Sequence, residues 1–278
     1  MANHRQIVII NDCSYVMATL VPHLKTEGYE VEHLLRSRSL WSKTVGLLWK
    51  IARTQKKALF HVNYALQDAY LTSKLRSLDV LHCHGSDVRW TMKTRRYGWI
   101  VKHCLKKAKT VLYATEDMYE YIEPFRPDAA WLPTPINTMT FSFREPSHRS
   151  TLRALYFKQG YEEIPHALPE LLKKSGIRLD IHGKDWPYSE MPRILSQYDI
   201  FVDRFSISSF SKTCLEAMSC GLTTIDYRHL PCLKDRIDEL LDLKHRIREA
   251  NSNRALVVSR HDSRTVARKL IDVYQRLS

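Results

Sequence analysis

Short apolar runs alternate with helical patterns along most of the chain. Each apolar run has only four to six residues, and an uninterrupted run of this length is typical of a strand buried on both faces of a parallel sheet. Helical patterns, such as those at 97–107 and 212–220, separate the runs, which predicts βαβ units. Strands are expected at Ile7–Ile10, Val31–Leu35, Ala58–Val62, Val80–Cys83, Thr110–Ala114, Leu152–Phe157, Leu179–His182, Ile200–Asp203 and Thr223–Asp226.

The pattern is interrupted once, between residues 124 and 150, where five prolines occur and helix signals are scarce. Such a stretch predicts a linker, and a chain of 278 residues has room for two domains. We therefore expect two Rossmann-like α/β domains, 1–140 and 141–262, with parallel sheets facing across a cleft that binds ligands. An amphipathic helix within 263–278 follows them and is expected to cross back to the first domain.

The length of the apolar runs, the N-terminal sequence and the spacing of the cysteines limit the classes of protein that this chain can represent. No apolar run approaches the roughly 20 residues that a membrane-spanning helix needs, and the N-terminus leads into a strand pattern without the apolar region of a signal peptide. The six cysteines show neither a Cys-x-x-Cys pair nor zinc-like spacing, so neither a structural metal nor a disulfide framework is expected. These features indicate a cytoplasmic protein.

The positive charge of the chain is concentrated in one region. Residues 33–115 contain 17 Lys or Arg and three acidic residues. This region alone therefore accounts for the net charge of +13 of the whole chain. A local basic surface favours an anionic partner, which leaves nucleic acid, anionic lipid and a phosphorylated substrate as candidates.

Part of this basic region has an amphipathic pattern. On a helix, Trp41, Leu48 and Ile51 would share one face with Val45, and Lys43, Lys50 and Arg53 would lie on the other. Tryptophan combined with a basic polar face is typical of a helix at a membrane interface, which would place the protein on the inner face of the membrane. The same pattern fits a helix packed on its own domain with a solvated basic face.

The segment from Met191 to Ile225 carries the most informative chemistry. A strand opens into a serine-rich turn, and the turn leads to a helix that is expected to begin near Ser211. Backbone N–H groups at a helix start favour a phosphate group. Glu216 follows about one turn later, where a carboxylate accepts hydrogen bonds from ribose hydroxyls, and Lys212 adds a positive charge suited to a diphosphate.

This segment resembles the donor-binding signature of family 4 glycosyltransferases with the GT-B fold. The match consists of Phe210 and the run Leu-Glu-Ala-Met-Ser-Cys-Gly around Glu216, whereas Ser208 and Ser211 replace the Glu and Gly of the family signature. The resemblance implies that Glu216 binds the ribose of a nucleotide sugar. It also implies that the residue at position 208 contacts the sugar, and serine departs from the family there.

Two motifs in the N-terminal half extend the resemblance. The run His61-Val62-Asn63-Tyr64 is similar to a strand-end motif of the family, and His84-Gly85-Ser86-Asp87 is similar to its loop after the next strand. By resemblance, His84 approaches the donor sugar and Asp87 holds the loop, so these two are the catalytic candidates. The segment 131–138 is similar to the family's interdomain segment, without its glycine.

The phosphate-binding lysines of the family are less clear in this sequence. Lys158, with Gly160, and Lys184 are candidates, and Trp186 or Tyr188 could flank the base or pack on the surface. An Asp-x-Asp metal motif is absent from the sequence. We therefore expect no cofactor and no metal, with helix N–H groups and lysine stabilising the diphosphate instead.

Together these features predict a retaining glycosyltransferase that moves a sugar from a nucleoside diphosphate sugar to an acceptor. The expected partners are the nucleotide sugar and an anionic membrane surface or lipid-linked acceptor, and no nucleic acid. Two alternatives stay open. The basic region suits a nucleic-acid-binding protein, although no recognised DNA- or RNA-binding motif accompanies it. The serine at position 208 suits a catalytically inactive scaffold of the same fold.

Overall fold

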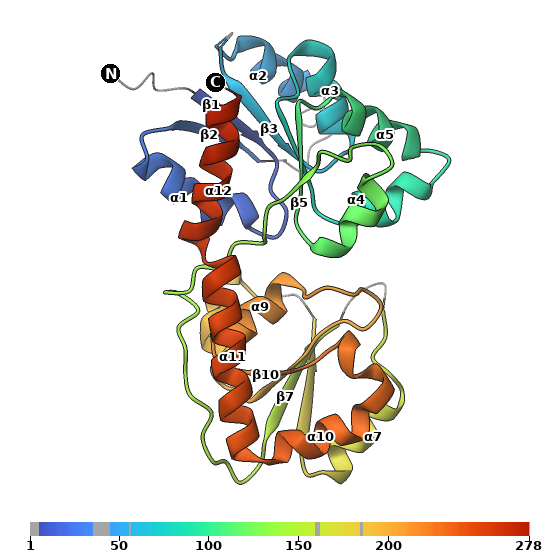
Figure 1. The fold of residues 1–278 in the computed structure, drawn as a ribbon, viewed down its shortest axis with the longest axis vertical. Coiled ribbons are helices and arrows are strands. Elements are labelled where there is room, and N and C mark those ends of the chain that lie inside the picture. The colour runs from blue at the N-terminus through green and yellow to red at the C-terminus, as the bar shows by residue number, and fades with distance from the viewer. Residues whose placement is uncertain (1–5, 36–44, 56, 159–161, 184–185, 278) are drawn as a thin grey trace. The chain divides into compact units, whose positions relative to one another are not determined.

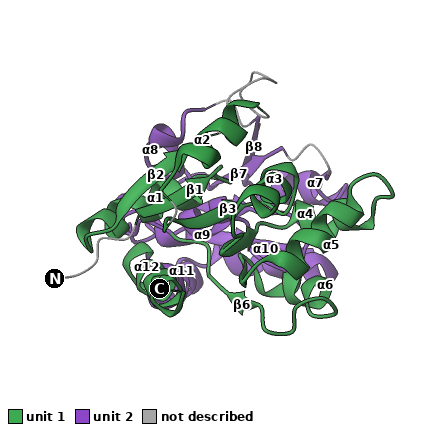
Figure 2. Ribbon diagram, turned by 90° about the horizontal axis from the view of Figure 1, so that it is seen from above, with its two compact units in different colours: residues 1–135, 263–278 green, residues 136–262 purple. Residues whose placement is uncertain are grey.

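The computed structural model describes residues 6–35, 45–55, 57–158, 162–183 and 186–277. They form two compact units, coloured separately in Figure 2: residues 1–135 with 263–278 (unit 1), and residues 136–262 (unit 2). Three residues that the sequence analysis singled out, Trp41, Gly160 and Lys184, lie outside the described residues, as does Lys43 of the amphipathic pattern.

Unit 1 contains a parallel sheet in the order β2-β1-β3-β4-β5-β6. Its central strands β3 and β4 are buried along their whole length, as expected for uninterrupted apolar runs. The nine predicted strands of the two units all form, and each begins and ends within one residue of the prediction. The strands of unit 1 are β1 Gln6–Ile10, β2 Glu30–Leu34, β3 Leu59–Asn63, β4 Val80–Cys83, β5 Thr110–Tyr113 and β6 Ala130–Trp131.

Helices cover both faces of this sheet. On one face, Ile7 and Ile9 pack with Leu20 of α1 and with Leu270 and Tyr274 of α12, and Figure 1 shows these two helices side by side. On the other face, the core includes side chains from α2, α3 and α5. The helices of unit 1 are α1 Val16–Thr26, α2 Leu47–Arg53, α3 Gln67–Leu75, α4 Ser86–Arg89, α5 Gly98–Lys107, α6 Tyr119–Ile122 and α12 Ser263–Arg276.

The described part of the amphipathic basic segment is the short helix α2. Ile51 is fully buried in the core of unit 1, which agrees with packing on its own domain. Trp49 is 58% exposed, with the guanidinium of Arg53 4.4 Å from its ring centroid. Val45, which the pattern assigned to the apolar face, is 47% exposed. No helix in the described part of the chain is long and apolar enough to cross a membrane.

Unit 2 contains a smaller parallel sheet in the order β10-β9-β7-β8. Its short strands pack between two apolar cores, one of which includes Phe201 and Leu215 and the other Ile200 and Leu240. The strands are β7 Arg153–Phe157, β8 Arg178–His182, β9 Ile200–Val202 and β10 Thr223–Ile225. The helices are α7 Ala167–Lys174, α8 Met191–Leu195, α9 Lys212–Ser219, α10 Leu233–Leu241 and α11 Leu243–His261.

The stretch 124–150 is more ordered than a linker. It contributes β6, which pairs with β5, and it buries Phe141 to 1% exposure in the core of unit 2. The carbonyl of Phe141 accepts hydrogen bonds from Ser219 Oγ at 2.6 Å and from Arg254 at 3.0 Å. The proline-rich composition hid these contacts because a single buried aromatic residue has no periodic pattern.

Candidate functional site

The carboxyl end of β9 leads into a serine-rich turn and then into α9. Ser211 caps this helix: its Oγ accepts the N–H of Cys214 at 3.0 Å, and its own N–H donates to Asp203 Oδ2 at 2.9 Å. The helix therefore begins at Lys212, close to the predicted start. Among the described residues, no acceptor lies within hydrogen-bond distance of the N–H of Thr213, which leaves an amide donor at the positive end of the helix.

Glu216 lies one turn inside α9 and is only 1% exposed. Tyr188 donates its hydroxyl to Glu216 Oε1 at 2.6 Å, and Lys212 Nζ lies 3.4 Å from the same oxygen. Lys212 Nζ also lies 2.8 Å from the Tyr188 hydroxyl and 4.4 Å from its ring centroid. Burial raises the pKa of Glu216, and the Lys212 charge and the Tyr188 hydrogen bond oppose that rise. A ribose hydroxyl bound to Oε1 would share this oxygen with the Tyr188 hydroxyl and Lys212 Nζ.

Phe210 and Ser208 lie in the turn before α9. The Phe210 ring is half-buried, with the Tyr227 ring 6.2 Å away and the Arg228 guanidinium 4.7 Å from its centroid. Arg228 is held in turn by two hydrogen bonds of 2.8 Å to the buried Asp226, just after β10. Ser208 is exposed. The turn therefore presents the serine to solvent and fixes the phenylalanine.

Two residues that the sequence analysis missed hold this turn in shape. The carboxylate of Glu162 accepts the N–H of Phe205 as well as the N–H and hydroxyl of Ser206, the last two at 2.8 and 2.9 Å. Arg204 donates to the carbonyl of Ser209 at 3.2 Å and to its hydroxyl at 2.9 Å. An acid that lies 43 residues from its partner has no local sequence signal, so only the fold reveals it.

Two further candidates, Lys158 and Trp186, follow the strands β7 and β8. Lys158 follows β7, its side chain is exposed, and its N–H donates to the carbonyl of His182 at 2.8 Å. Trp186 packs with its ring centroid 4.3 Å from that of His182 and contacts the unit 2 core. Of the two aromatic candidates for the base, Trp186 thus packs against the protein and Tyr188 contacts Glu216.

In unit 1, His84 follows β4 and its imidazole has a defined partner. His84 Nε2 lies 2.9 Å from Asn63 Oδ1, and Asn63 Nδ2 donates to the carbonyl of Asn11 at 3.1 Å. Since the amide nitrogen faces a carbonyl, the amide oxygen must accept from His84, and we infer that the proton is on Nε2 and that Nδ1 is the acceptor. Burial lowers the pKa of His84 to about 3, so the ring is neutral.

Asp87 is fully buried and bonded to the backbone. Its carboxylate accepts the N–H groups of Ala65 at 3.1 Å, Gly85 at 2.8 Å and Val88 at 3.1 Å, with that of His84 at 3.3 Å. It therefore ties the loop after β3 to the loop after β4. Burial raises the pKa of Asp87, and these backbone hydrogen bonds oppose the rise.

Gly85 gives this loop its path. Its φ of +125° is strained for any residue with a side chain, and a Cβ atom there would lie 2.1 Å from Arg89 Nη1. Arg89 is itself fixed by two hydrogen bonds to Asp117, at 2.7 and 2.9 Å. The loop can thus hold His84 in one position.

A row of buried histidines extends from His84 into unit 1. The His82 ring centroid lies 4.2 Å from that of His84 and 5.7 Å from that of His61. His61 Nδ1 lies 2.6 Å from the hydroxyl of Tyr274, on α12. Burial lowers the pKa of His61 to about 3 and that of His82 well below its usual value. The row was not predicted, because it brings together residues of β3 and β4, the loop after β4 and, through Tyr274, the last helix of the chain.

Comparison with known proteins identifies the architecture. No protein-family model matches the sequence, and no curated protein matches it. Among solved structures, the UDP-forming α,α-trehalose-phosphate synthase from Burkholderia xenovorans superposes with a TM-score of 0.64 over 98% of both chains, at 9% identity. The chain has the GT-B fold. This agrees with the two predicted Rossmann-like units and their parallel sheets.

Two further structures share the GT-B fold with this chain. The N-terminal domain of Candida albicans trehalose-6-phosphate phosphatase matches with a TM-score of 0.62 at 7% identity, over 97% of this chain and 98% of that one. A point mutant of S. aureus TarM, solved with fondaparinux, α-GlcNAc-glycerol and UDP, matches with a TM-score of 0.56 at 8% identity, over 82% of this chain and 58% of that one. At these identities the likeness shows the fold alone.

Proposed function

We propose that this protein is a glycosyltransferase that takes its sugar from a nucleoside diphosphate sugar, with retention of the anomeric configuration. The observation that carries the proposal is the buried Glu216 carboxylate, set one turn behind the capped start of α9. A carboxylate at that distance suits ribose hydroxyls while the phosphates lie at the helix end. Structures of the same fold named as a UDP-forming synthase and as a complex with UDP support this choice of donor.

The chemistry assigned to unit 2 is stabilisation of the leaving diphosphate. Negative charge grows on the leaving group as the sugar bond breaks, and the N-terminus of α9 offers the N–H of Thr213 and the positive end of the helix dipole. Lys212 already lies against Glu216 and would add its charge to the diphosphate. In this proposal the site works without a metal ion.

Unit 1 would contribute His84, which the resemblance assigns to the donor sugar. Its ring is neutral, and its Nε2 is held by Asn63, so it would act as a fixed hydrogen-bonding group in a single tautomer. Asp87 is a positioning residue here because its oxygens are bonded to the backbone. The acceptor in this proposal is a lipid-linked molecule or one at a membrane surface, given the basic charge of residues 33–115.

Two observations favour a second candidate, an inactive scaffold of the same fold. The Tyr188 hydroxyl occupies Glu216 Oε1, and Ser208 offers no carboxylate to the sugar. A GT-B match to the N-terminal domain of a protein named as a phosphatase is consistent with this candidate. A scaffold would be distinguished from an enzyme by its failure to turn over a donor that it binds.

The test is titration calorimetry of UDP-, GDP- and ADP-sugars into the wild-type protein and three variants, followed by assays of donor hydrolysis. Glu216→Gln should weaken the preferred donor about 10- to 100-fold, because a hydrogen bond to a charged group is lost. The control Glu190→Gln removes an exposed carboxylate of unit 2 that pairs with Arg193 and should bind donor normally.

Tyr188→Phe sharpens the same experiment. It removes the hydroxyl that would compete with ribose for Glu216 Oε1 while keeping the ring, so it should bind donor about fivefold more tightly than wild type. Binding without hydrolysis or transfer would favour the scaffold. If wild type binds none of the donors, or if Glu216→Gln binds as wild type does, the donor-site assignment is wrong.

A further inference from the structure

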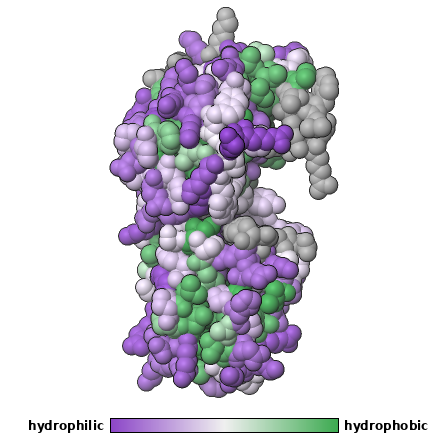
Figure 3. All heavy atoms as spheres, turned by 90° about the vertical axis from the view of Figure 1, so that its right-hand side faces the viewer, coloured by the Kyte–Doolittle hydropathy of each residue, from purple (hydrophilic) through white to green (hydrophobic). Residues whose placement is uncertain are grey.

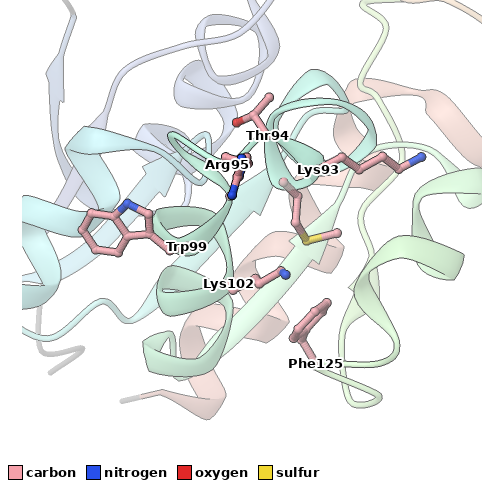
Figure 4. A pocket seen from close by; sticks show the side chains of 8 residues that line it. Lys93, Thr94, Arg95, Trp99, Lys102 and Phe125 are labelled. Carbon is pink, nitrogen blue, oxygen red and sulfur yellow. The ribbon is translucent and has the colours of Figure 1, made fainter.

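Unit 1 has a cavity that the proposed donor chemistry does not use. It has a volume of about 500 Å³. It is lined by the segment before α5, by α5 itself and by Phe125, which follows α6. Figure 4 shows its side chains, with Lys102 of α5 and Phe125 turned towards each other. Its lining residues are Met92, Lys93, Thr94, Arg95, Gly98, Trp99, Lys102 and Phe125.

Three cations line this cavity with their charge uncompensated. Within the described residues, no Asp or Glu lies within ion-pair distance of Lys93, Arg95 or Lys102. Three other cations of unit 1 do pair with an acidic residue: Arg89 with Asp117, Lys109 with Asp79 and Arg126 with Asp128. The sequence has no acidic residue between residues 88 and 115. In the structure, this leaves positive charge concentrated around the cavity.

Aromatic rings hold two of these cations in place. Lys93 Nζ lies 4.7 Å from the ring centroid of Tyr121, and Lys102 Nζ lies 5.6 Å from that of Phe125. A ring attracts a cation through its quadrupole and leaves the net charge intact. The lysines are therefore positioned and still able to bind an anion.

The remaining lining suits a small ligand that has both a charged and an apolar part. Met92 is buried and Phe125 is half-buried, so they add apolar surface beneath the cations. The Trp99 ring does not add to this surface: its centroid lies 5.3 Å from that of Tyr70, and Figure 4 shows it turned away from Lys102 and Phe125. In the space-filling view, hydrophilic side chains predominate on this side of unit 1 (Figure 3).

We propose that this cavity binds the phosphate group of a small ligand, either the headgroup of an anionic lipid or a soluble phosphate ester. Lys93, Arg95 and Lys102 would contact the phosphate, and the apolar floor would contact the rest of the ligand. A concave site of this size favours a headgroup over a nucleic-acid backbone, which tracks along an open groove or stripe. The inference does not depend on the proposed sugar transfer.

The test compares two variants of the full chain that lose the same charge from unit 1. The cavity variant carries Lys93→Gln, Arg95→Gln and Lys102→Gln. The control carries Lys25→Gln, Lys74→Gln and Lys269→Gln, which are also exposed and two of which also lie over aromatic rings. Circular dichroism and urea unfolding first establish that both variants fold, as expected for exposed side chains.

Binding is then measured with two phosphate probes, phosphatidylcholine vesicles with and without phosphatidylglycerol and glycerol 3-phosphate, and with duplex DNA for comparison. The cavity variant should lose about 100-fold in affinity for the probe that wild type binds, and the control less than about threefold. Binding of the anionic vesicles alone identifies a lipid headgroup, and binding of glycerol 3-phosphate identifies a soluble ester. Equal losses in both variants, or binding of duplex DNA but of neither probe, would overturn the proposal.

Discussion

The loop after β4 in unit 1 and the turn after β9 in unit 2 both follow the carboxyl end of a strand in a parallel sheet, and they differ in the helix to which they lead. In unit 1, the amides of residues 65, 85 and 88 donate to Asp87, a carboxylate of the loop itself. In unit 2, Ser211 caps α9 and the N–H of Thr213 has no acceptor among the described residues. The N–H of Thr213 thus lies at the start of an eight-residue helix, whereas the β4 loop leads into α4, which has only four residues.

The comparison explains why the two units would attract anions by different means. Unit 2 offers a helix end and one lysine, which suits a phosphate placed in a fixed orientation. Unit 1 offers lysine and arginine side chains around a cavity whose lining begins at Met92, soon after the end of α4. Net charge along the sequence therefore points to the side-chain cations of unit 1 and says little about the amides of unit 2.

Replacing the carboxylate of the first loop should have the largest effect on stability. Asp87→Ala leaves several buried amides without an acceptor, and we expect it to lower the free energy of unfolding by about 4 kcal/mol. Urea unfolding measures this change. The control Ser86→Ala alters the neighbouring residue and should cost less than about 0.5 kcal/mol. A similar cost for both would show that Asp87 does not hold the loop.

Acid should destabilise unit 1 through its buried histidines. His61 and His82 are fully buried and neutral in the folded protein, because burial lowers the pKa of each, whereas the unfolded chain takes up protons below about pH 6.5. The free energy of unfolding is therefore unaffected by these histidines above pH 6.5. It decreases as the pH drops towards 3, by about 1.4 kcal/mol per pH unit for each histidine.

His82→Phe tests this expectation, because the ring is replaced at a site where neither nitrogen has a hydrogen-bond partner among the described residues. Urea unfolding between pH 6.5 and pH 5 gives the free energy of unfolding as a function of pH. For this variant the slope should be smaller by the contribution of one histidine, about 1.4 kcal/mol per pH unit. His148→Phe, at an exposed site in unit 2, serves as the control and should leave the slope unchanged. An identical slope in His82→Phe would mean that this histidine is protonated in the fold.

The cap of α9 should give the smallest effect. Ser211→Ala removes the acceptor of the Cys214 N–H, and we expect a loss of about 1 kcal/mol in the free energy of unfolding. Ser208→Ala changes an exposed serine three residues earlier and should be neutral. If the two variants unfold alike, Ser211 does not cap the helix, and the description of the helix start is wrong.

The strands and the start of α9 could be predicted because they follow from local pattern. Parallel strands such as β1 and β4 are continuous apolar runs bounded by polar residues, and Ser211 is a common capping residue. The helix α11 was missed because its buried positions include Arg246, Asn253 and His261, which break the apolar stripe on which helix prediction relies.

The positions of the candidate residues on the fold were predicted better than their contacts, and their role in binding stays a prediction. Glu216, Lys212 and Ser211 were proposed from one segment, and the structure places them on one helix end. The hydrogen bond from Tyr188 to Glu216 joins residues 28 apart, and that from Ser206 to Glu162 joins residues 44 apart. Such contacts depend on which strand ends meet in the sheet, and no local pattern encodes that.

The return of α12 to unit 1 has a consequence for synthesis. Unit 2 is continuous in sequence, from 136 to 262, whereas one face of the unit 1 sheet is covered by a helix made after it. While the ribosome builds residues 136–262, Ile7 and Ile9 still lack Leu270 and Tyr274, so this apolar face is open to chaperones or to other nascent chains. Unit 2 can therefore finish folding first, although its synthesis begins second.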